Sequence, residues 1–424
     1  MELLQYKFAD SEIARCIAGA NPASGTMQVD ITSPAFKADP YPFYARMRAE
    51  APVHQLTLPD NREAWLVVRY AEVAAVLNDE RFIKDRFKTP ELTAKQPWMP
   101  KSFLPLTHNM LDQDPPDHTR LRSLVHKVFT PRLVEEMRRR VQSLTDEFLE
   151  AAKPTGKMDL IRDYALPLPS TIIAEMLGVP AEDRHRFHRW TNSMVISDTS
   201  KLSLLRALPA VLALLRYVRK IVKKRRSEPR DDLASALVRA EEAGDQLSED
   251  ELVAMIVLLL IAGHETTVNL IGNGTLALLE HPEQMDQLRK NPAMIQSAVE
   301  EMLRYDGPLA MATERFASED VSVSGVAIPR NALVFAVLGS ANRDEQQFPN
   351  PDNLDLARAD NKHVAFGLGI HYCLGAPLAR LEGQIAINTL LQRAPALRLA
   401  VPREKLRWRR GYVLRGLNSL PVAF

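Results

Sequence analysis

The hydrophobic pattern of the chain is dominated by one long helix, predicted from about Ser248 to Glu280. Ser248 and Glu251, three residues apart, form the sequence pattern of a capping box at its start. The dipeptide His281-Pro282 ends the helical pattern. At a rise of 1.5 Å per residue this helix is roughly 50 Å long, which is enough to cross a whole domain.

Most of the remaining chain also shows helical periodicity. A second helix is predicted to begin at Asn291-Pro292 and to end at Asp306-Gly307-Pro308. Strand-like runs are short and occur at Ala64–Val68, Val321–Ile328 and Leu333–Val337. We therefore predict a mainly α protein with a minor β portion.

Composition narrows the class of protein. With 424 residues, 46% hydrophobic and 25% charged, the chain resembles an ordinary globular protein. A net charge of +1 gives no indication of a nucleic-acid partner. Two cysteines rule out a disulfide framework and indicate a reducing cytoplasm. The longest apolar run, Leu252 to Gly263, is too short for a membrane span, which needs about 20 residues.

Cys373 lies in the most informative run of the chain, Phe366-Gly367-Leu368-Gly369-Ile370-His371-Tyr372-Cys373-Leu374-Gly375-Ala376-Pro377. A helix is predicted directly after it, from Pro377 to Leu391, and a helix N-terminus stabilises a thiolate. The glycines let the backbone approach something flat and close. These are the requirements of a thiolate that ligates haem iron. A buried free cysteine fits the local pattern equally well.

The long helix contains Ala262-Gly263-His264-Glu265-Thr266-Thr267. A carboxylate beside a hydroxyl in an apolar helix is costly unless it is used or solvated. In the alternative interpretation, Glu265 lies on a solvent face and Thr266 bonds to the backbone of its own helix.

The residues Phe366, Gly369, Cys373 and Gly375 match, in order and spacing, the haem-binding signature of the cytochrome P-450 family. The chain resembles the soluble, bacterial-type members of that family from about residue 35 to the end. The resemblance implies one domain over residues 31–424, after a loosely ordered extension at residues 1–30. It also implies a long central helix over haem b, with Cys373 as the iron ligand in a loop beneath it.

The same resemblance assigns further residues at the haem. Glu265 and Thr266 correspond to the acid–alcohol pair, in which the acid relays protons and the hydroxyl hydrogen-bonds dioxygen where it is activated. Phe366 packs beside the sulfur, and N–H groups near Leu374 and Gly375 donate to it. The implied cofactor-binding residues are His118, Arg122, Arg315 and His371 for the two propionates, with Ala262, Phe366, Gly367 and Gly375 elsewhere at the haem.

Glu301 and Arg304 lie three residues apart on the second predicted helix, hence on one face. From the residues alone, the simplest interpretation is a surface ion pair worth under about 1 kcal/mol. The family resemblance implies instead a structural clamp on the haem-binding core. Its third member would be Arg343, in the loop before the cysteine.

The predicted function is a haem-thiolate monooxygenase. It would insert one atom of dioxygen into an apolar small molecule, by hydroxylation or epoxidation, and the scaffold resembles enzymes that tailor polyketides, macrolides or terpenoids. Electrons would come from a reductase through a ferredoxin or flavodoxin. This partner would dock on the cysteine side, where the candidate contacts are Lys127, Arg132 and Arg380.

Two other functions stay open. One is a peroxide-driven fatty-acid peroxygenase, which the pair Glu265-Thr266 argues against, and the other is a non-catalytic haem-thiolate binding or sensing protein. The segment Leu202–Arg226 is interpreted as helix over the substrate pocket, with a basic membrane-surface helix as the alternative. The expected pocket lining is Trp98–Leu106, Leu202–Arg226, Leu260, Ile261, Leu309–Ala312 and Val413-Leu414.

Overall fold

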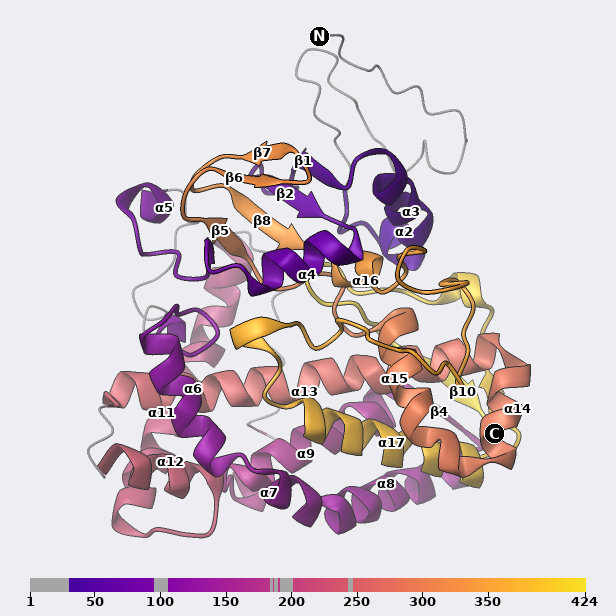
Figure 1. Cartoon of the computed structure of the whole chain (residues 1–424). Coiled ribbons are helices and arrows are strands. Elements are labelled where there is room, and N and C mark those ends of the chain that lie inside the picture. Colours follow the sequence, from indigo (N-terminus) through magenta and orange to yellow (C-terminus); the bar gives the residue numbers. More distant parts are fainter. Residues whose placement is uncertain (1–29, 95–105, 184–185, 187–189, 191–200, 243–246) are drawn as a thin grey trace.

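The computed structural model of the chain describes residues 30–94, 106–183, 186, 190, 201–242 and 247–424 (Figure 1). Its organising element is α13, Glu249–Glu280, which crosses the molecule as predicted. The predicted capping box is present, because the Ser248 hydroxyl accepts the Glu251 N–H at 3.2 Å and the Glu251 carboxylate accepts the Ser248 N–H at 2.7 Å. The predicted extension falls almost entirely outside the described residues, so the division into extension and domain stays a prediction.

The helix α13 is buried because other helices surround it. The neighbours that pack on it include α9 (Pro167–Met176), α11 (Lys201–Ser227), α15 (Ile295–Asp306) and α17 (Ala376–Arg393). By length and composition α13 could cross a membrane, but 72% of its most apolar 18-residue window is buried inside the protein. Its apolar surface is therefore used for packing in the core.

The remaining helices form the shell of this body and are mostly short. α8 carries one apolar stripe, with Val141, Leu144 and Leu149 buried. The other helices are α2 (Pro34–Ala38), α3 (Tyr41–Glu50), α4 (Tyr70–Asn78), α5 (Pro90–Ala94), α6 (Asp117–Val128), α7 (Pro131–Glu136), α8 (Arg138–Ala152), α12 (Leu233–Glu242), α14 (Pro282–Lys290) and α16 (Leu338–Ala341). Single turns occur at η2 (Lys153–Thr155), η3 (Ile161–Ala165), η4 (Ala181–Asp183), η5 (Pro292–Met294), η6 (Gly369–His371) and η7 (Arg403–Lys405).

The β portion lies mainly to one side of the helices (Figure 1). A five-stranded sheet has the order β1-β2-β8-β5-β3, and a three-stranded sheet has the order β4-β10-β9. Only β2 and β8 pair in parallel among the described strands, with Trp65 opposite Val334. The strands are β1 (Val53–Thr57), β2 (Glu63–Val67), β3 (Phe82–Ile83), β4 (Lys157–Asp159), β5 (Arg315–Ala317), β6 (Val321–Val323), β7 (Val326–Ile328), β8 (Leu333–Ala336), β9 (Arg398–Leu399) and β10 (Pro421–Ala423).

Two of the three predicted strands are confirmed to within one residue, as β2 and β8. The run Val321–Ile328 was wrong as a single strand, because it folds back as the hairpin of β6 and β7. Ser324 and Gly325 form the turn with φ of 49° and 79°. Positive φ at both central residues matches the twist of a tight hairpin.

A fully buried carboxylate, Glu301, ties α15 to the loop that leads to the cysteine. Arg304 binds it at 2.7 Å through two nitrogens and also donates to backbone carbonyls of the loop, including that of Asn342. Arg358 approaches the same carboxylate at 3.1 Å, and the Asp355 N–H donates to it at 2.9 Å. The side chains of Glu301 and Arg304 have no exposed surface. This pair is therefore internal, unlike the surface pair that the residues alone suggest.

Arg343 occupies a different place from the one predicted. Among the described contacts, its guanidinium donates to the Tyr305 carbonyl at 2.8 Å and pairs with Asp352, and Arg358 takes the predicted position on Glu301. The Arg343 guanidinium lies 3.8 Å from the ring centroids of both Tyr41 and Tyr305. The assignment of Arg343 as third member of the clamp was therefore wrong. The loop folds back on α15, which brings Arg358 rather than Arg343 to the carboxylate.

The burial of Glu301 predicts a large effect on stability. Arg304→Ala should lower the free energy of unfolding by about 3–5 kcal/mol, because it leaves a buried carboxylate without its bidentate partner. Arg46→Ala is the control, since Arg46 and Glu50 form a partly exposed pair on α3 and should contribute less than about 1 kcal/mol. Urea denaturation of both variants measures the difference. Equal losses would show that the buried clamp does not stabilise the fold.

Candidate functional site

The cysteine loop, residues 366–376, is shaped by two glycines and one backbone bond. Gly367 and Gly369 have φ of 71° and 68°, which L side chains rarely adopt. A Cβ at Gly369 would also lie only 2.8 Å from the carbonyl oxygen of Leu77. The Cys373 N–H donates to the Phe366 carbonyl at 2.9 Å and closes the loop. The glycines therefore fix the loop against α4 while the backbone bond fixes the cysteine.

Cys373 is a half-buried residue just before the first turn of α17. Burial raises the pKa of the Cys373 thiol, and N–H groups of Gly375 and Ala376, with Arg122 and Arg380, lower it in part. These N–H groups lie at and next to Gly375, in the region predicted near Leu374 and Gly375. A thiol that coordinates a metal ion is deprotonated by the metal. The loop thus supplies a soft ligand with hydrogen-bond donors already aimed at it.

The acid–alcohol segment lies in the middle of α13. Ala262 is the only exposed residue of this helix between Leu252 and Leu278, and Thr266, one turn later, is half-buried. The Thr266 hydroxyl donates to the Ala262 carbonyl at 3.0 Å, as in the interpretation of a back-bonded threonine. Ala262 and Thr266 therefore form an accessible strip on a helix that is otherwise core.

Glu265 does not lie on a solvent face, and that alternative was wrong. Its side chain is 4% exposed and forms an ion pair with Arg409. The buried ring of His264 lies on its other side, with Nε2 3.8 Å from the carboxylate and Nδ1 2.7 Å from the Leu260 carbonyl oxygen. Burial lowers the pKa of His264, so this ring is held neutral beside the acid.

Sequence reasoning did not identify Arg409, which comes from the C-terminal segment after β9. No local pattern marks it, since it is one of several arginines in Arg407-Trp408-Arg409-Arg410. The fold brings the segment to the site through Leu414, which bridges to Leu309, and through the Val413 carbonyl, which accepts the Ala310 N–H at 2.8 Å. Two segments of the predicted pocket lining are therefore neighbours.

The other pocket predictions differ in outcome. Leu202–Arg226 falls within α11, whose residues Val211, Leu214 and Val218 are buried and which packs on α12 and α13. This packing favours a helix of the fold over a membrane-surface helix. Leu260 and Ile261 lie on α13. Trp98–Leu106 lies outside the described residues except for Leu106.

Four predicted propionate-binding residues converge near Cys373. The rings of His118 on α6 and His371 in the cysteine loop are 4.3 Å apart between centroids. Arg122 follows His118 by one turn and donates to the Tyr372 carbonyl at 2.6 Å. Arg315 on β5 is 4% exposed. The structure thus joins residues from three distant parts of the chain.

Lys84 is a further member of this cluster that sequence reasoning missed. It is 3% exposed, and its ammonium group donates to the Thr313 hydroxyl at 2.5 Å and the Glu314 carbonyl at 2.6 Å. Burial, and after it the charge of Arg315, lower the pKa of Lys84 to about 7. The position of this lysine directly after the buried strand β3 was the only hint in the sequence that it is buried. The residues to which it donates lie more than two hundred residues away, so the sequence did not reveal its role.

The charge balance of this cluster fits the propionates of haem. Burial is the main cause that lowers the pKa of His371 to about 2, and the basic neighbours Lys84, His118, Arg315 and Arg122 lower it further. Among the described residues, neither ring nitrogen of the buried His118 makes a hydrogen bond of good geometry. Buried cations and unpartnered donors are unfavourable unless an anion is present. The carboxylate that interacts with Arg315 is Asp114, which also accepts the N–H groups of Lys84 and Asp85.

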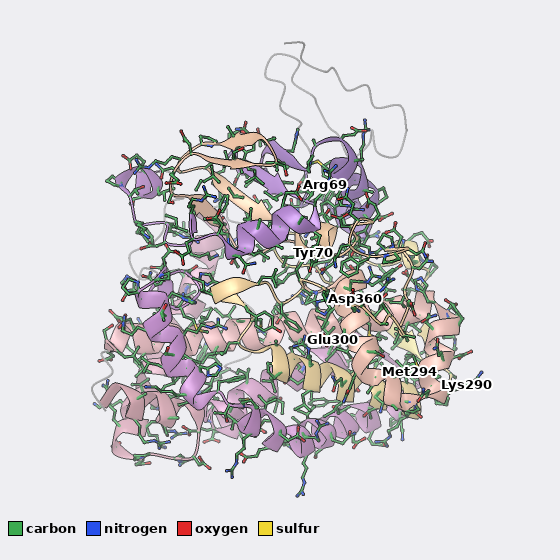
Figure 2. All side chains as sticks on the ribbon, in the orientation of Figure 1. Arg69, Tyr70, Lys290, Met294, Glu300 and Asp360 are labelled. Atoms are coloured by element: carbon green, nitrogen blue, oxygen red, sulfur yellow. The ribbon has the colours of Figure 1, made fainter. Side chains whose placement is uncertain are left out.

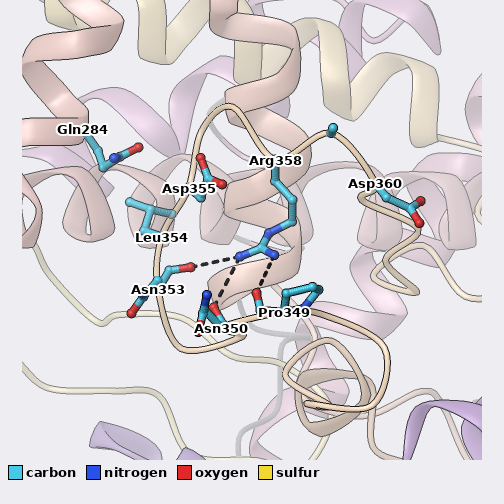
Figure 3. Close-up of a pocket in the computed structure, with 9 residues that line it drawn as sticks. Gln284, Pro349, Asn350, Asn353, Leu354, Asp355, Arg358 and Asp360 are labelled. Carbon is cyan, nitrogen blue, oxygen red and sulfur yellow. Dashed lines mark hydrogen bonds between the residues drawn. The ribbon is translucent and has the colours of Figure 1, made fainter.

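A surface cavity of about 500 Å³ lies over the loop that carries Arg358 (Figure 3). Arg358 points into the loop and donates to carbonyls of Pro349, Asn350 and Asn353, while Asp355 and Asp360 point away from it. The lining includes none of the predicted haem-binding residues. The cavity therefore belongs to the clamp of Glu301 rather than to the site around Cys373.

Comparisons with known proteins agree with this geometry. The family model of cytochrome P450 matches residues 58–395. The cytochrome P450 monooxygenase PikC of Streptomyces venezuelae is 46% identical over 391 residues, 91% of each chain. The polyketide biosynthesis cytochrome P450 PksS of Bacillus subtilis is 44% identical over 392 residues, which cover 92% of this chain and 96% of the relative.

A solved structure matches the same architecture. The myxobacterial cytochrome P450 CYP267B1, in complex with myristic acid, superposes with a TM-score of 0.89 at 43% identity. The match covers 93% of this chain and 98% of that protein. The family carries haem with a cysteine thiolate ligand, in agreement with the cysteine loop and the basic cluster described above. The chain therefore belongs to the cytochrome P450 family and is a monooxygenase.

Proposed function

We propose that Cys373 ligates the iron of haem b and that the ring lies between the cysteine loop and the accessible strip of α13. The observation that carries this proposal is the buried basic cluster. One member of this cluster, His371, is only two residues from Cys373, so the cluster and the cysteine belong to one site. His118, Arg122, Arg315, His371 and, in addition, Lys84 would bind the propionates. When bound, the haem supplies the activation of dioxygen.

The residues of α13 handle protons in this proposal. Glu265 lies buried in an ion pair with Arg409, so its carboxylate is the group that would accept a proton entering from solvent. The Thr266 hydroxyl donates to the Ala262 carbonyl and keeps its oxygen lone pairs available on the half-buried face. Gly263 lets α9 pack closely behind this strip, since a Cβ there would lie 3.2 Å from a side-chain carbon of Ile173.

We propose an apolar substrate of the polyketide or macrolide class, oxidised by hydroxylation or epoxidation. The name of PksS supports a polyketide, whereas the myristic acid bound to CYP267B1 shows that a related scaffold accepts a fatty acid. The apolar residues that precede the accessible strip of α13, Leu260 and Ile261, support an apolar ligand over a charged one. The terpenoid alternative is supported by a relative named vitamin D(3) 25-hydroxylase, which is 47% identical over 401 residues. The peroxygenase and sensor functions are less favoured, because relatives are named as a monooxygenase and a hydroxylase.

Electrons would come through a ferredoxin or flavodoxin on the cysteine side, in a reducing cytoplasm. Exposed basic residues on this side support an acidic partner, and Arg132, paired with Glu136, is 89% exposed. Tyr372 and Ile370 of the cysteine loop are also exposed. Arg380, however, binds Glu300 of its own chain through two nitrogens, so its availability to a partner is reduced.

Cys373→Ala tests the ligand assignment. The reduced, carbon-monoxide-bound protein should lose the Soret band that is specific to a thiolate ligand, because no other soft ligand lies in the loop. Cys16→Ala is the matched control and should keep the band, since Cys16 is the other cysteine of the chain. A thiolate band in the Cys373→Ala protein would refute the assignment.

Thr266→Ala tests the role of the hydroxyl. Product formed per electron consumed should fall about tenfold or more and peroxide release should rise, because a positioned hydroxyl that takes part in proton delivery is lost. Thr266→Ser retains the hydroxyl and should stay close to the unsubstituted protein. The measurement is the ratio of product and peroxide to reduced nicotinamide with a surrogate ferredoxin system. An unchanged ratio in Thr266→Ala would exclude a proton role for this residue.

Ligand titration of the oxidised protein tests the substrate class. A macrolide or polyketide that fits the apolar pocket should displace water from the iron and convert the low-spin to the high-spin Soret spectrum. Terpenoids and fatty acids form the comparison panel. A tight shift with fatty acids alone would contradict the polyketide proposal and favour the class seen with CYP267B1.

A further inference from the structure

Arg380 on α17 is held in a network that ends at the proposed iron ligand. Its Nε and Nη2 donate to the two carboxylate oxygens of Glu300 at 2.7 and 2.8 Å. Figure 2 labels Glu300 on α15, where it faces the start of α17. The guanidinium carbon lies 4.5 Å from the ring centroid of Phe366, which is the distance of a cation–π contact. The arginine is therefore fixed at both its edge and its face.

His363 completes the network on the other side of Glu300. Its Nδ1 accepts the Ala365 N–H at 3.2 Å, so Nε2 carries the proton and donates to Glu300 at 3.1 Å. The His363 side chain is only 3% exposed, and its ring lies 6.1 Å from that of Phe366. Burial opposes ionisation of Glu300, but hydrogen bonds from Arg380 and His363 lower its pKa to about 2. Glu300 is thus a fixed anion.

Two physical routes connect this network to the sulfur. The first is mechanical, since the Phe366 carbonyl accepts the Cys373 N–H at 2.9 Å and the Phe366 ring lies between Arg380 and His363. The second is electrostatic, because the Arg380 guanidinium lies close to the cysteine: it contacts the Phe366 ring, and its Nη1 donates to the hydroxyl of Tyr372, the residue before Cys373, at 3.4 Å. An exposed ion pair away from the loop would have neither connection to the sulfur and would contribute little to the stability of the fold. This pair is about 30% exposed on each side and contacts the loop directly.

We propose that Arg380 and Glu300 set the reduction potential of the haem iron by the balance of their charges, while Arg380 positions Phe366 beside the ligating sulfur. The inference rests on the proposed ligation by Cys373. Reduction adds one electron to the haem–thiolate unit, so the cation favours the reduced form and the anion disfavours it. Glu300 therefore limits how far Arg380 raises the potential. Both act as positioning residues, since neither touches the substrate.

The opposite signs of the two charges make the proposal testable by spectroelectrochemical titration of the haem-bound protein. Arg380→Gln should shift the reduction potential to more negative values, because the cation is lost and Glu300 remains. Glu300→Gln keeps the shape of the side chain and should shift the potential to more positive values. The double variant should return toward the potential of the unsubstituted protein. Arg380→Lys retains the charge and separates the electrostatic from the stacking contribution.

Controls distinguish this inference from simpler explanations. Arg162→Gln removes an arginine that pairs with Asp163 on the surface, and it should leave the potential unchanged. Shifts of the same sign in Arg380→Gln and Glu300→Gln would refute the charge balance and indicate displacement of Phe366 alone. No shift in either variant would refute the inference altogether. Each variant must show the thiolate Soret band of the carbon monoxide complex. Its absence in the unsubstituted protein would instead overturn ligation by Cys373.

Discussion

Two adjacent glutamates on α15 hold the cysteine loop and the chain that leads to it in place. Glu301 is buried and neutralised by Arg304 and Arg358, and it gathers the long loop after α16 through bonds to Asp355 and Asn361. Glu300 points to the neighbouring face and holds His363 and Arg380. The loop between α16 and η6 contains no helix or strand, so side-chain bonds must fix its course. One helix thus anchors both the approach to the cysteine loop and the helix that follows it.

The sequence was sufficient for the features that depend on local chemistry. The limits of α13 follow from the capping box at Ser248 and from Pro282, and the start of α17 follows from the proline after the cysteine loop. The convergence of His118 and His371 was predictable only through the family resemblance, because no periodicity relates two residues so far apart. The hairpin at Ser324 was missed because Ser-Gly between two valine-rich runs also reads as a continuous strand.

Features that arise from the path of the chain were beyond sequence reasoning. Arg343 and Arg358 are both arginines near the loop, and only the fold decides which one reaches Glu301. Lys84 and Arg409 lie far in sequence from the residues that they accompany, and neither stands in a recognisable pattern. In each case a buried charged group is paired with a residue that is distant in sequence and comes close only in the folded protein. Such pairs cannot be predicted from a short segment of the sequence.

The C-terminal segment from Arg409 to Leu414 contacts both the acid of α13 and the proposed substrate pocket, and this has a consequence for how the enzyme evolves. The cysteine side is held by polar bonds from α15, whereas the proposed substrate side is built from apolar packing on α11 and α13. Substrate range can therefore drift while the electron chemistry stays constant. The exception is this segment, because Leu414 bridges to the proposed pocket and Arg409 binds the acid of α13. If Glu265 relays protons as proposed, a substitution here that changes the substrate also changes proton supply, so regioselectivity and coupling efficiency change together.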